Sequence, residues 1–196
     1  IKVFGDLDRI SDESDKNPTS VYGRSKLAAE KCIESTLRNY HNYYLLRPVM
    51  IYGEGNKGNL PKLYDLLIKG VPYFFGSWEN KRSILSIQNV QFVICRLIND
   101  TVKSGCYILA DDEPISTARM VQLLFAANKK SYRNWGIPLF IITFAIWLTK
   151  LLGIDLLAKM LGDLEVDNSK LKKALEIDKM PVKVEEGLAM LARSFK

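Results

Sequence analysis

The chain of 196 residues carries 28 basic and 22 acidic side chains, for a formal charge of +6, and 47% of its residues are hydrophobic. This composition is that of a globular protein able to bury a sizeable core, and it excludes a disordered or low-complexity chain. The basic residues are spread along the sequence rather than gathered in runs, so we predict no nucleic-acid binding, and the surplus charge suits either a small anionic ligand or an ordinary solvated surface.

The beginning of the chain predicts a strand end, a loop and one long helix. Residues 1–5 alternate apolar and polar side chains and stop at glycine, which indicates the end of a β-strand. Residues 6–17 hold five acidic side chains and no apolar period, so we predict an exposed loop there. Thr19 or Ser20 can then cap a helix that continues to about Arg38.

Strands and helices alternate in the middle of the chain. Three short apolar stretches are predicted as strands: residues 43–50, 82–87 and 106–110. Asn59 can cap a helix that Gly70 ends. Residues 90–98 keep helical apolar spacing, and Ser116 can cap a helix that runs to Ala127. This alternation is typical of an α/β sheet.

The last quarter, from Trp135 onward, is predicted to be helical throughout, with a cap at residues 167–168 and a final helix at residues 184–194. Its longest uncharged segment, residues 134–149, is 16 residues long. A membrane-spanning helix needs about 20 residues, so we predict none. We expect residues 137–152 to pack inside the protein or against a partner, with weak contact to a membrane surface as the alternative.

Cysteine and histidine usage predicts neither a disulfide frame nor a metal site. Cys32, Cys95 and Cys106 are odd in number, widely spaced and form no Cys-x-x-Cys pair. The single histidine, His41, has no second ligand beside it in the sequence. Such cysteine usage fits a reducing compartment, so we predict a cytoplasmic protein.

One short motif is suited to chemistry. In Tyr22-Gly-Arg-Ser-Lys26 a phenol and an ammonium group are four residues apart, so both project from one face of a helix. Tyrosine is a poor acid or base at neutral pH because its reference pKa is about 10, but a nearby cation favours the phenolate. Lys26 would supply that cation and could also hold a ribose hydroxyl. By itself, the pattern is more often a solvated helix face.

Three segments, in order along the chain, carry a family resemblance. They are residues 21–26 (VYGRSK) after the acidic loop, residues 46–55 (LRPVMIYGEG) and residues 82–90 (RSILSIQNV). The third is similar to an Arg-Asp-x-x-x-Val-x-Asp-Val pattern. Together they resemble the extended short-chain dehydrogenase/reductase family, of the NAD-dependent nucleotide-sugar epimerase/dehydratase type that includes UDP-hexose 4-epimerases.

The resemblance implies an α/β fold made of two parts. Residues 1–55 would be the end of a Rossmann-type parallel sheet that carries the Tyr-x-x-x-Lys motif. Residues 56–196 would be a smaller, mostly helical substrate-binding domain, with segments around 82–100 returning to the sheet.

The resemblance also implies roles for particular residues. Tyr22 and Lys26 would be catalytic and would contact the cofactor, NAD, or NADP if the enzyme is a reductase. Pro48 and Val49 would lie beside the nicotinamide of the cofactor. The residues implied to bind a UDP-sugar are Asn59, Leu60 and Arg82. Arginine suits such a site because its planar donors can bind phosphate oxygens in pairs, although a surface ion pair would also explain Arg82. For Asn59, helix capping alone is an equal explanation.

The first of two departures from the family pattern is that residues of the cofactor and catalytic sites are missing. The sequence holds no glycine-rich Gly-x-x-Gly-x-x-Gly turn and no acidic residue to hold the adenosine ribose, so tight NAD binding is not expected. The Ser or Thr partner of Tyr22 would lie one position before Ile1. We therefore expect a fragment or a truncated gene product that has no activity by itself.

The second departure is Met50, where many sugar-nucleotide 4-epimerases have an asparagine. It argues against a plain UDP-glucose 4-epimerase. Groups with Arg-Pro at this place include UDP-N-acetylhexosamine 4-epimerases, 4-keto-sugar reductases of surface-polysaccharide pathways and steroid-type dehydrogenases.

Three functions therefore remain open. The parent protein is either a nucleotide-sugar 4-epimerase, whose NAD is regenerated in place, or a 4-keto-sugar reductase that consumes NADPH or NADH. In the third hypothesis the chain is a non-catalytic remnant. For a full-length enzyme of this family we expect a homodimer.

Overall fold

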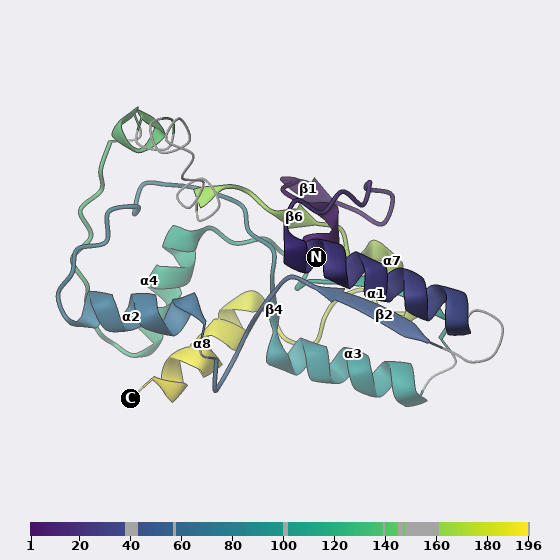
Figure 1. Cartoon of the computed structure of the whole chain (residues 1–196). Coiled ribbons are helices and arrows are strands. Elements are labelled where there is room, and N and C mark those ends of the chain that lie inside the picture. The colour runs from purple at the N-terminus through teal and green to yellow at the C-terminus, as the bar shows by residue number, and fades with distance from the viewer. Residues whose placement is uncertain are drawn as a thin grey trace.

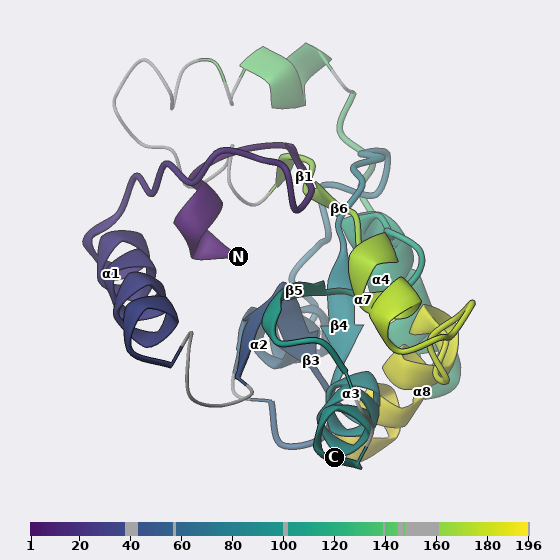
Figure 2. The same cartoon turned by 90° about the vertical axis from the view of Figure 1, so that its right-hand side faces the viewer.

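The computed structural model describes residues 1–37, 43–56, 58–99, 102–138, 140–144, 147 and 161–195 (Figure 1, Figure 2). In chain order the elements are η1 (Lys2–Phe4), β1 (Arg9–Ile10), α1 (Val21–Leu37), β2 (Tyr44–Pro48), β3 (Met50–Tyr52), α2 (Asn59–Ile68), β4 (Ile84–Ser86), α3 (Ile87–Asn99), β5 (Gly105–Leu109), α4 (Thr117–Ala127), β6 (Glu165–Val166), α7 (Ser169–Ala174) and α8 (Val184–Ser194).

The strands form three parallel pairs: β1 with β6, β2 with β5, and β3 with β4. Two backbone hydrogen bonds join the second and third pairs. The amide of Val49 donates to Leu109 O at 3.1 Å, and the amide of Asp111 donates to Ile84 O at 2.8 Å. Helices connect these parallel strands, which confirms the predicted α/β class.

The hydrophobic core has two main parts. Figure 1 shows α2, α4 and α8 gathered at one end of the molecule, and α1, α3 and α7 around β2 at the other. The first group buries Tyr64, Leu67, Leu124, Phe125, Leu188 and Leu191. Beside β2 and β5, the residues buried include Leu85, Val93, Leu97, Leu109 and Leu171. Helices α1 and α3 lie on different sides of β2 (Figure 1).

Several predicted boundaries are confirmed because local chemistry sets them. The Ser20 hydroxyl accepts a hydrogen bond from the amide of Gly23 at 3.0 Å at the start of α1. The Ser116 hydroxyl does the same for the amide of Arg119 at 3.1 Å at the start of α4. Gly70, with φ at 88°, follows the last turn of α2. Such caps need only neighbours in the sequence.

The predicted strand at residues 1–5 is wrong, because the structure has the 3₁₀-helix η1 there. Val3 and Phe4 are consecutive and both buried, whereas consecutive side chains of a strand point to opposite faces. The amide of Phe4 donates to Ile1 O at 3.2 Å, which closes the turn.

Two further expectations are corrected by the short pair of β1 and β6. Residues 6–17 are not all loop, and the last quarter is not helical throughout, because Ile10 pairs with Val166. Ile10 is buried, so this contact adds to the small core around η1. Strands of two residues are too short to show any periodicity in the sequence.

Asn59 is not the cap of α2. Gly58 occupies that position, and its amide donates to the Asn56 side chain at 2.6 Å. At residues 167–168, by contrast, Asp167 accepts from the amide of Ser169 at 2.8 Å, as a residue at the start of a helix is expected to do.

A buried polar network holds the carboxyl ends of the central strands together. The Asp111 carboxylate accepts from the Tyr52 hydroxyl at 2.9 Å, from the Asn89 amide group at 2.7 Å and from the amide of Ser86 at 3.1 Å. Burial raises the pKa of Asp111, and these three hydrogen bonds oppose that rise. Asn89 also donates to Val182 O at 2.8 Å, so the network fixes the chain just before α8.

Replacing Tyr52 by phenylalanine is expected to lower the free energy of unfolding by about 1.5–3 kcal/mol, the usual value of a hydrogen bond to a charged group. Urea unfolding followed by circular dichroism measures this loss. Tyr44→Phe is the matched control, because the Tyr44 hydroxyl donates at 2.9 Å to a neutral acceptor, Val102 O. It should cost about 0.5–1.5 kcal/mol, and equal losses for the two variants would contradict the prediction.

Candidate functional site

The first turns of α1 present the predicted tyrosine and lysine to solvent. Tyr22 is 61% exposed, and Lys26 is exposed as well. The Lys26 ammonium lies 5.4 Å from the centre of the Tyr22 ring. The two side chains therefore share one helix face, as their spacing of four predicts, and the cation lies over the tyrosine ring.

The glycine between them brings α1 close to η1. A Cβ atom on Gly23 would lie 2.6 Å from Lys2 O and 2.9 Å from the Pro18 Cβ. Only glycine fits at this distance, because carbon atoms do not approach backbone oxygen so closely. Gly23 thus allows α1 to pack closely against η1, and the same motif carries Tyr22 and Lys26, the residues suited to chemistry.

A buried ion pair fixes the middle of α1 against β2. The Arg47 guanidinium donates to both oxygens of Glu30, from Nε at 2.9 Å and from NH2 at 2.5 Å. Arg47 is 3% exposed, and its guanidinium lies 5.0 Å over the Phe4 ring. Sequence reasoning missed this pair, which joins α1, β2 and η1 one helical turn beyond Lys26.

A cleft of about 680 Å³ runs between α1 and the strand ends. It is lined by Tyr22 and Lys26 from α1, Pro48 from β2, Val49 between β2 and β3, and Arg82 before β4. Five of the seven predicted site residues are therefore brought together. Three elements that are far apart in the sequence supply them.

Arg82 is held in the wall of this cleft by its backbone and by its side chain. Its amide and carbonyl bond with Ile115 at 3.0 and 2.9 Å, and its NH1 donates to Gly162 O at 2.8 Å. Burial lowers the pKa of the guanidinium, and the carboxylate of Asp163 opposes this. The planar fork of an arginine suits a bidentate contact to phosphate oxygens.

Asn59 and Leu60 do not line the cleft. Asn59 is exposed at the first position of α2, and Leu60 is buried in the cluster of α2, α4 and α8. The Leu60 side chain is occupied by packing, so a ligand could reach this position only through the backbone. Their role in binding a substrate stays a prediction.

A model of the NAD dependent epimerase/dehydratase family matches residues 2–108, which include all of the predicted site residues. The chain belongs to this family. The match confirms the family that the three sequence segments resemble.

Curated relatives of this epimerase/dehydratase chain act on activated sugars. The UDP-glucose 4-epimerase of Vibrio cholerae is 32% identical over 191 residues, which are 93% of this chain and 56% of that protein. The N-acetyl-alpha-D-glucosaminyl-diphospho-ditrans,octacis-undecaprenol 4-epimerase of Escherichia coli O157:H7 is 26% identical over 171 residues, which are 83% of this chain and 49% of that protein. The chain thus spans about half the length of these relatives.

Solved structures show the same fold. The UDP-glucuronic acid 4-epimerase of Bacillus cereus in complex with NAD has a TM-score of 0.72 at 16% identity, covering 99% of this chain and 58% of that one. The UDP-glucose 4-epimerase of Thermotoga maritima with UDP-glucose has a TM-score of 0.70 at 17% identity, covering 99% and 60%. RMD from Pseudomonas aeruginosa complexed with NADPH has a TM-score of 0.71 at 16% identity, covering 99% and 63%.

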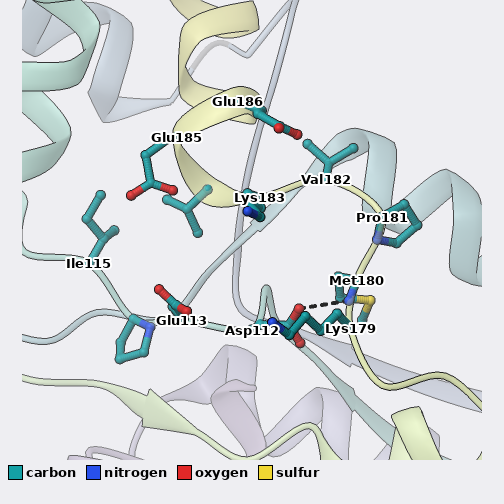
Figure 3. A pocket seen from close by; sticks show the side chains of 12 residues that line it. Asp112, Glu113, Ile115, Lys179, Met180, Pro181, Val182, Lys183, Glu185 and Glu186 are labelled. Atoms are coloured by element: carbon teal, nitrogen blue, oxygen red, sulfur yellow. Dashed lines mark hydrogen bonds between the residues drawn. The ribbon is translucent and has the colours of Figure 1, made fainter.

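A second cavity in this epimerase/dehydratase chain, of about 350 Å³, was not predicted (Figure 3). It lies between the connection from β5 to α4 and the connection from α7 to α8. Asp112 joins the two connections, because it accepts from the amide of Met180 at 2.8 Å and from the Lys172 ammonium at 3.0 Å. The other charged residues that line the cavity are Glu113, Lys179, Lys183, Glu185 and Glu186. This mixture of charges selects no single class of ligand.

No group of residues that could hold a metal ion occurs within the described ranges. His41 lies outside those ranges. Cys32 and Cys95 are exposed free thiols, and burial raises the pKa of Cys106 to about 11. Cys106 is therefore a thiol rather than a thiolate at neutral pH and is a poor nucleophile.

Proposed function

We propose that this chain is part of an NAD-dependent 4-epimerase that acts on UDP-glucose and UDP-galactose or on a UDP-N-acetylhexosamine. The observation that supports the proposal is the cleft lined by Tyr22, Lys26, Pro48, Val49 and Arg82. Tyr22, with the Lys26 ammonium beside it, lines one part of the cleft, and Arg82, whose guanidinium suits a diphosphate, lines another. In the full-length protein we expect a homodimer in the cytoplasm.

The residues of the cleft fit the nicotinamide ribose end of NAD, since Tyr22 and Lys26 are exposed donors facing the Pro48–Val49 segment. NAD, when bound, supplies hydride acceptance and return at the sugar carbon. Tyr22 takes the proton from the sugar 4-hydroxyl as the carbonyl forms, and it gives the proton back when the hydride returns to the other face. Lys26 keeps a positive charge beside the Tyr22 ring and holds a ribose hydroxyl.

A second function, reduction of a 4-keto-sugar nucleotide, uses the same residues. It is favoured by Met50 in place of the asparagine of many 4-epimerases. In this reaction Tyr22 donates its proton to the keto oxygen, and the reduced cofactor is consumed. Product analysis separates the two functions, because only the reductase needs a stoichiometric supply of NADH or NADPH.

The name of the Escherichia coli relative adds a lipid-linked diphosphate sugar to the candidate substrates. The third alternative is a non-catalytic remnant, because the 196 residues contain no glycine-rich turn for the cofactor pyrophosphate. An assay of the purified chain with UDP-glucose and NAD tests it. We expect no turnover from the chain alone, and any turnover would rule out the remnant.

Arg82→Ala is expected to weaken the binding of UDP about ten-fold to a hundred-fold, because charge-assisted bonds to phosphate are lost. Calorimetry with UDP measures the change. Arg82→Lys should restore only part of the affinity, since lysine keeps the charge but not the paired donors.

Arg96→Ala is the matched control for this substitution. Arg96 is half-buried like Arg82 and also donates to a backbone carbonyl, Leu175 O, at 2.9 Å, but it lies on α3 outside the cleft. If Arg82 serves only the fold, the two alanine variants will lower the melting temperature alike and leave UDP affinity unchanged, and the proposed role will be wrong.

A further inference from the structure

An exposed aromatic segment, made of the described residues 135–138, 140–144 and 147, is not used by the proposed chemistry. Phe140 is 72% exposed, and Trp135, Phe144 and Trp147 are each close to 60% exposed. The rings of Phe144 and Trp147 stack with their centres 5.8 Å apart. Ile142 of the same segment, by contrast, is buried. Contiguous apolar surface of this kind marks an interaction site.

The aromatic segment is attached firmly to the body of the protein at its start. The amide of Trp135 donates to Tyr73 O at 2.9 Å, and the amide of Ile137 donates to Phe74 O at 3.3 Å. The Ser77 hydroxyl donates to Ile137 O at 2.9 Å. The helical turn at residues 140–144 lies at the outer edge of the molecule in both views (Figure 1, Figure 2).

The structure describes the chain again from Leu161 onward, and this part lies against residues 78–82. The Trp78 indole donates to Leu161 O at 2.8 Å, and Arg82 binds Gly162 O. Leu164 itself lines the cleft beside Arg82. Residues 73–82 therefore contact both the start of the aromatic segment and the chain at residues 161–164.

The charges around the aromatic segment indicate that its binding partner has an anionic surface. From Lys129 to Lys159 the sequence holds five basic side chains and one acidic side chain. Lys129, Lys130 and Arg133 are exposed directly before Trp135. Of the 27 residues from Trp135 to Leu161, 19 are apolar. Aromatic rings next to basic residues are typical of proteins that lie on anionic membranes, where indole rings sit at headgroup level.

We propose that the aromatic segment docks on the surface of an anionic lipid bilayer. The segment lies in the interface rather than crossing it, since no helix within the described ranges is long and apolar enough to span a membrane. Phe140, Phe144 and Trp147 enter the boundary between headgroups and acyl chains, and the flanking lysines and arginine contact the headgroups. This docking goes beyond the proposed function, because it needs neither NAD nor a sugar nucleotide.

Co-sedimentation of the 196-residue chain with vesicles tests the proposal. We expect binding to vesicles of phosphatidylcholine with phosphatidylglycerol, weaker binding to phosphatidylcholine alone, and a loss of affinity as salt rises. The double variant Phe144→Asp, Trp147→Asp should bind at least ten-fold more weakly. Ile98→Asp is the matched control, because Ile98 is 75% exposed on α3, away from the segment, and it should bind like the wild type.

Three results would overturn the docking. The wild type could fail to sediment with the anionic vesicles, or the double variant could bind them as well as Ile98→Asp does. The double variant could also abolish self-association in lipid-free sedimentation velocity while vesicle binding is unchanged, which would assign the segment to a second copy of the chain. Calorimetry with UDP separates this test from the proposed function, since the double variant should keep wild-type UDP affinity.

Discussion

Tyr22→Phe is expected to lower turnover by about 10²-fold to 10⁴-fold in an active enzyme that contains this chain together with a nucleotide-binding half, which is the usual value of a positioned acid or base. Only a hydroxyl is removed from a side chain that is 61% exposed, so the fold loses no packing. Steady-state rates with the UDP-sugar substrate measure the effect. UDP affinity and the melting temperature should stay at their wild-type values.

Tyr43→Phe is the control for loss of a tyrosine hydroxyl. Tyr43 precedes β2, is partly exposed and does not line the cleft. Its variant should keep the wild-type rate. If Tyr22→Phe retained more than half of that rate, Tyr22 would be a surface residue and the acid-base assignment would be wrong.

The features that could be predicted from the sequence are those set by near neighbours. The periodicity of a helix alone places Tyr22 and Lys26 on one face, and the hydroxyls of Ser20 and Ser116 cap helices through residues three positions away. The strand at Gly105–Leu109 was predicted within one residue, because a run of buried apolar residues bounded by turns is distinctive.

Features that depend on distant partners could not be predicted in this way. Ile10 forms a strand only because Val166 lies beside it, 156 positions further on. The second cavity joins two connections, and the Met180–Asp112 hydrogen bond between them spans 68 positions. Leu60 follows the family pattern for a substrate residue, yet the cluster around α2 buries its side chain. Whether such a residue packs in the core or is available to a ligand depends on its neighbours in the folded structure.

The same limit applies to Glu30 and Arg47, whose pairing over 17 positions links α1 to β2 through two buried hydrogen bonds. The sequence shows a glutamate four residues after Lys26, which reads as an ordinary charge on a solvated helix face. In the structure it is buried, and both of its oxygens are used. Glu30 lies two turns from Tyr22 on the same helix, so its bond to Arg47 also helps to fix the position of the Tyr22 side chain.

Glu30→Ala is expected to lower the free energy of unfolding by about 3–5 kcal/mol, because Arg47 is left as an uncompensated buried cation. Urea unfolding gives the value. The double variant Glu30→Leu, Arg47→Met should recover most of the loss, since apolar residues of similar volume can replace a buried pair.

Arg9→Ala is the matched control, because the Arg9 guanidinium also pairs with a glutamate, Glu165, at 3.3 Å, but its side chain is 81% exposed. An exposed pair is worth at most about 1 kcal/mol, since water screens the charges. Should Glu30→Ala cost no more than Arg9→Ala, the buried pair would not be what holds α1. The close contact of Gly23 with Lys2 O would then matter more for the position of Tyr22 and Lys26, and Gly23→Ala would be the more damaging substitution.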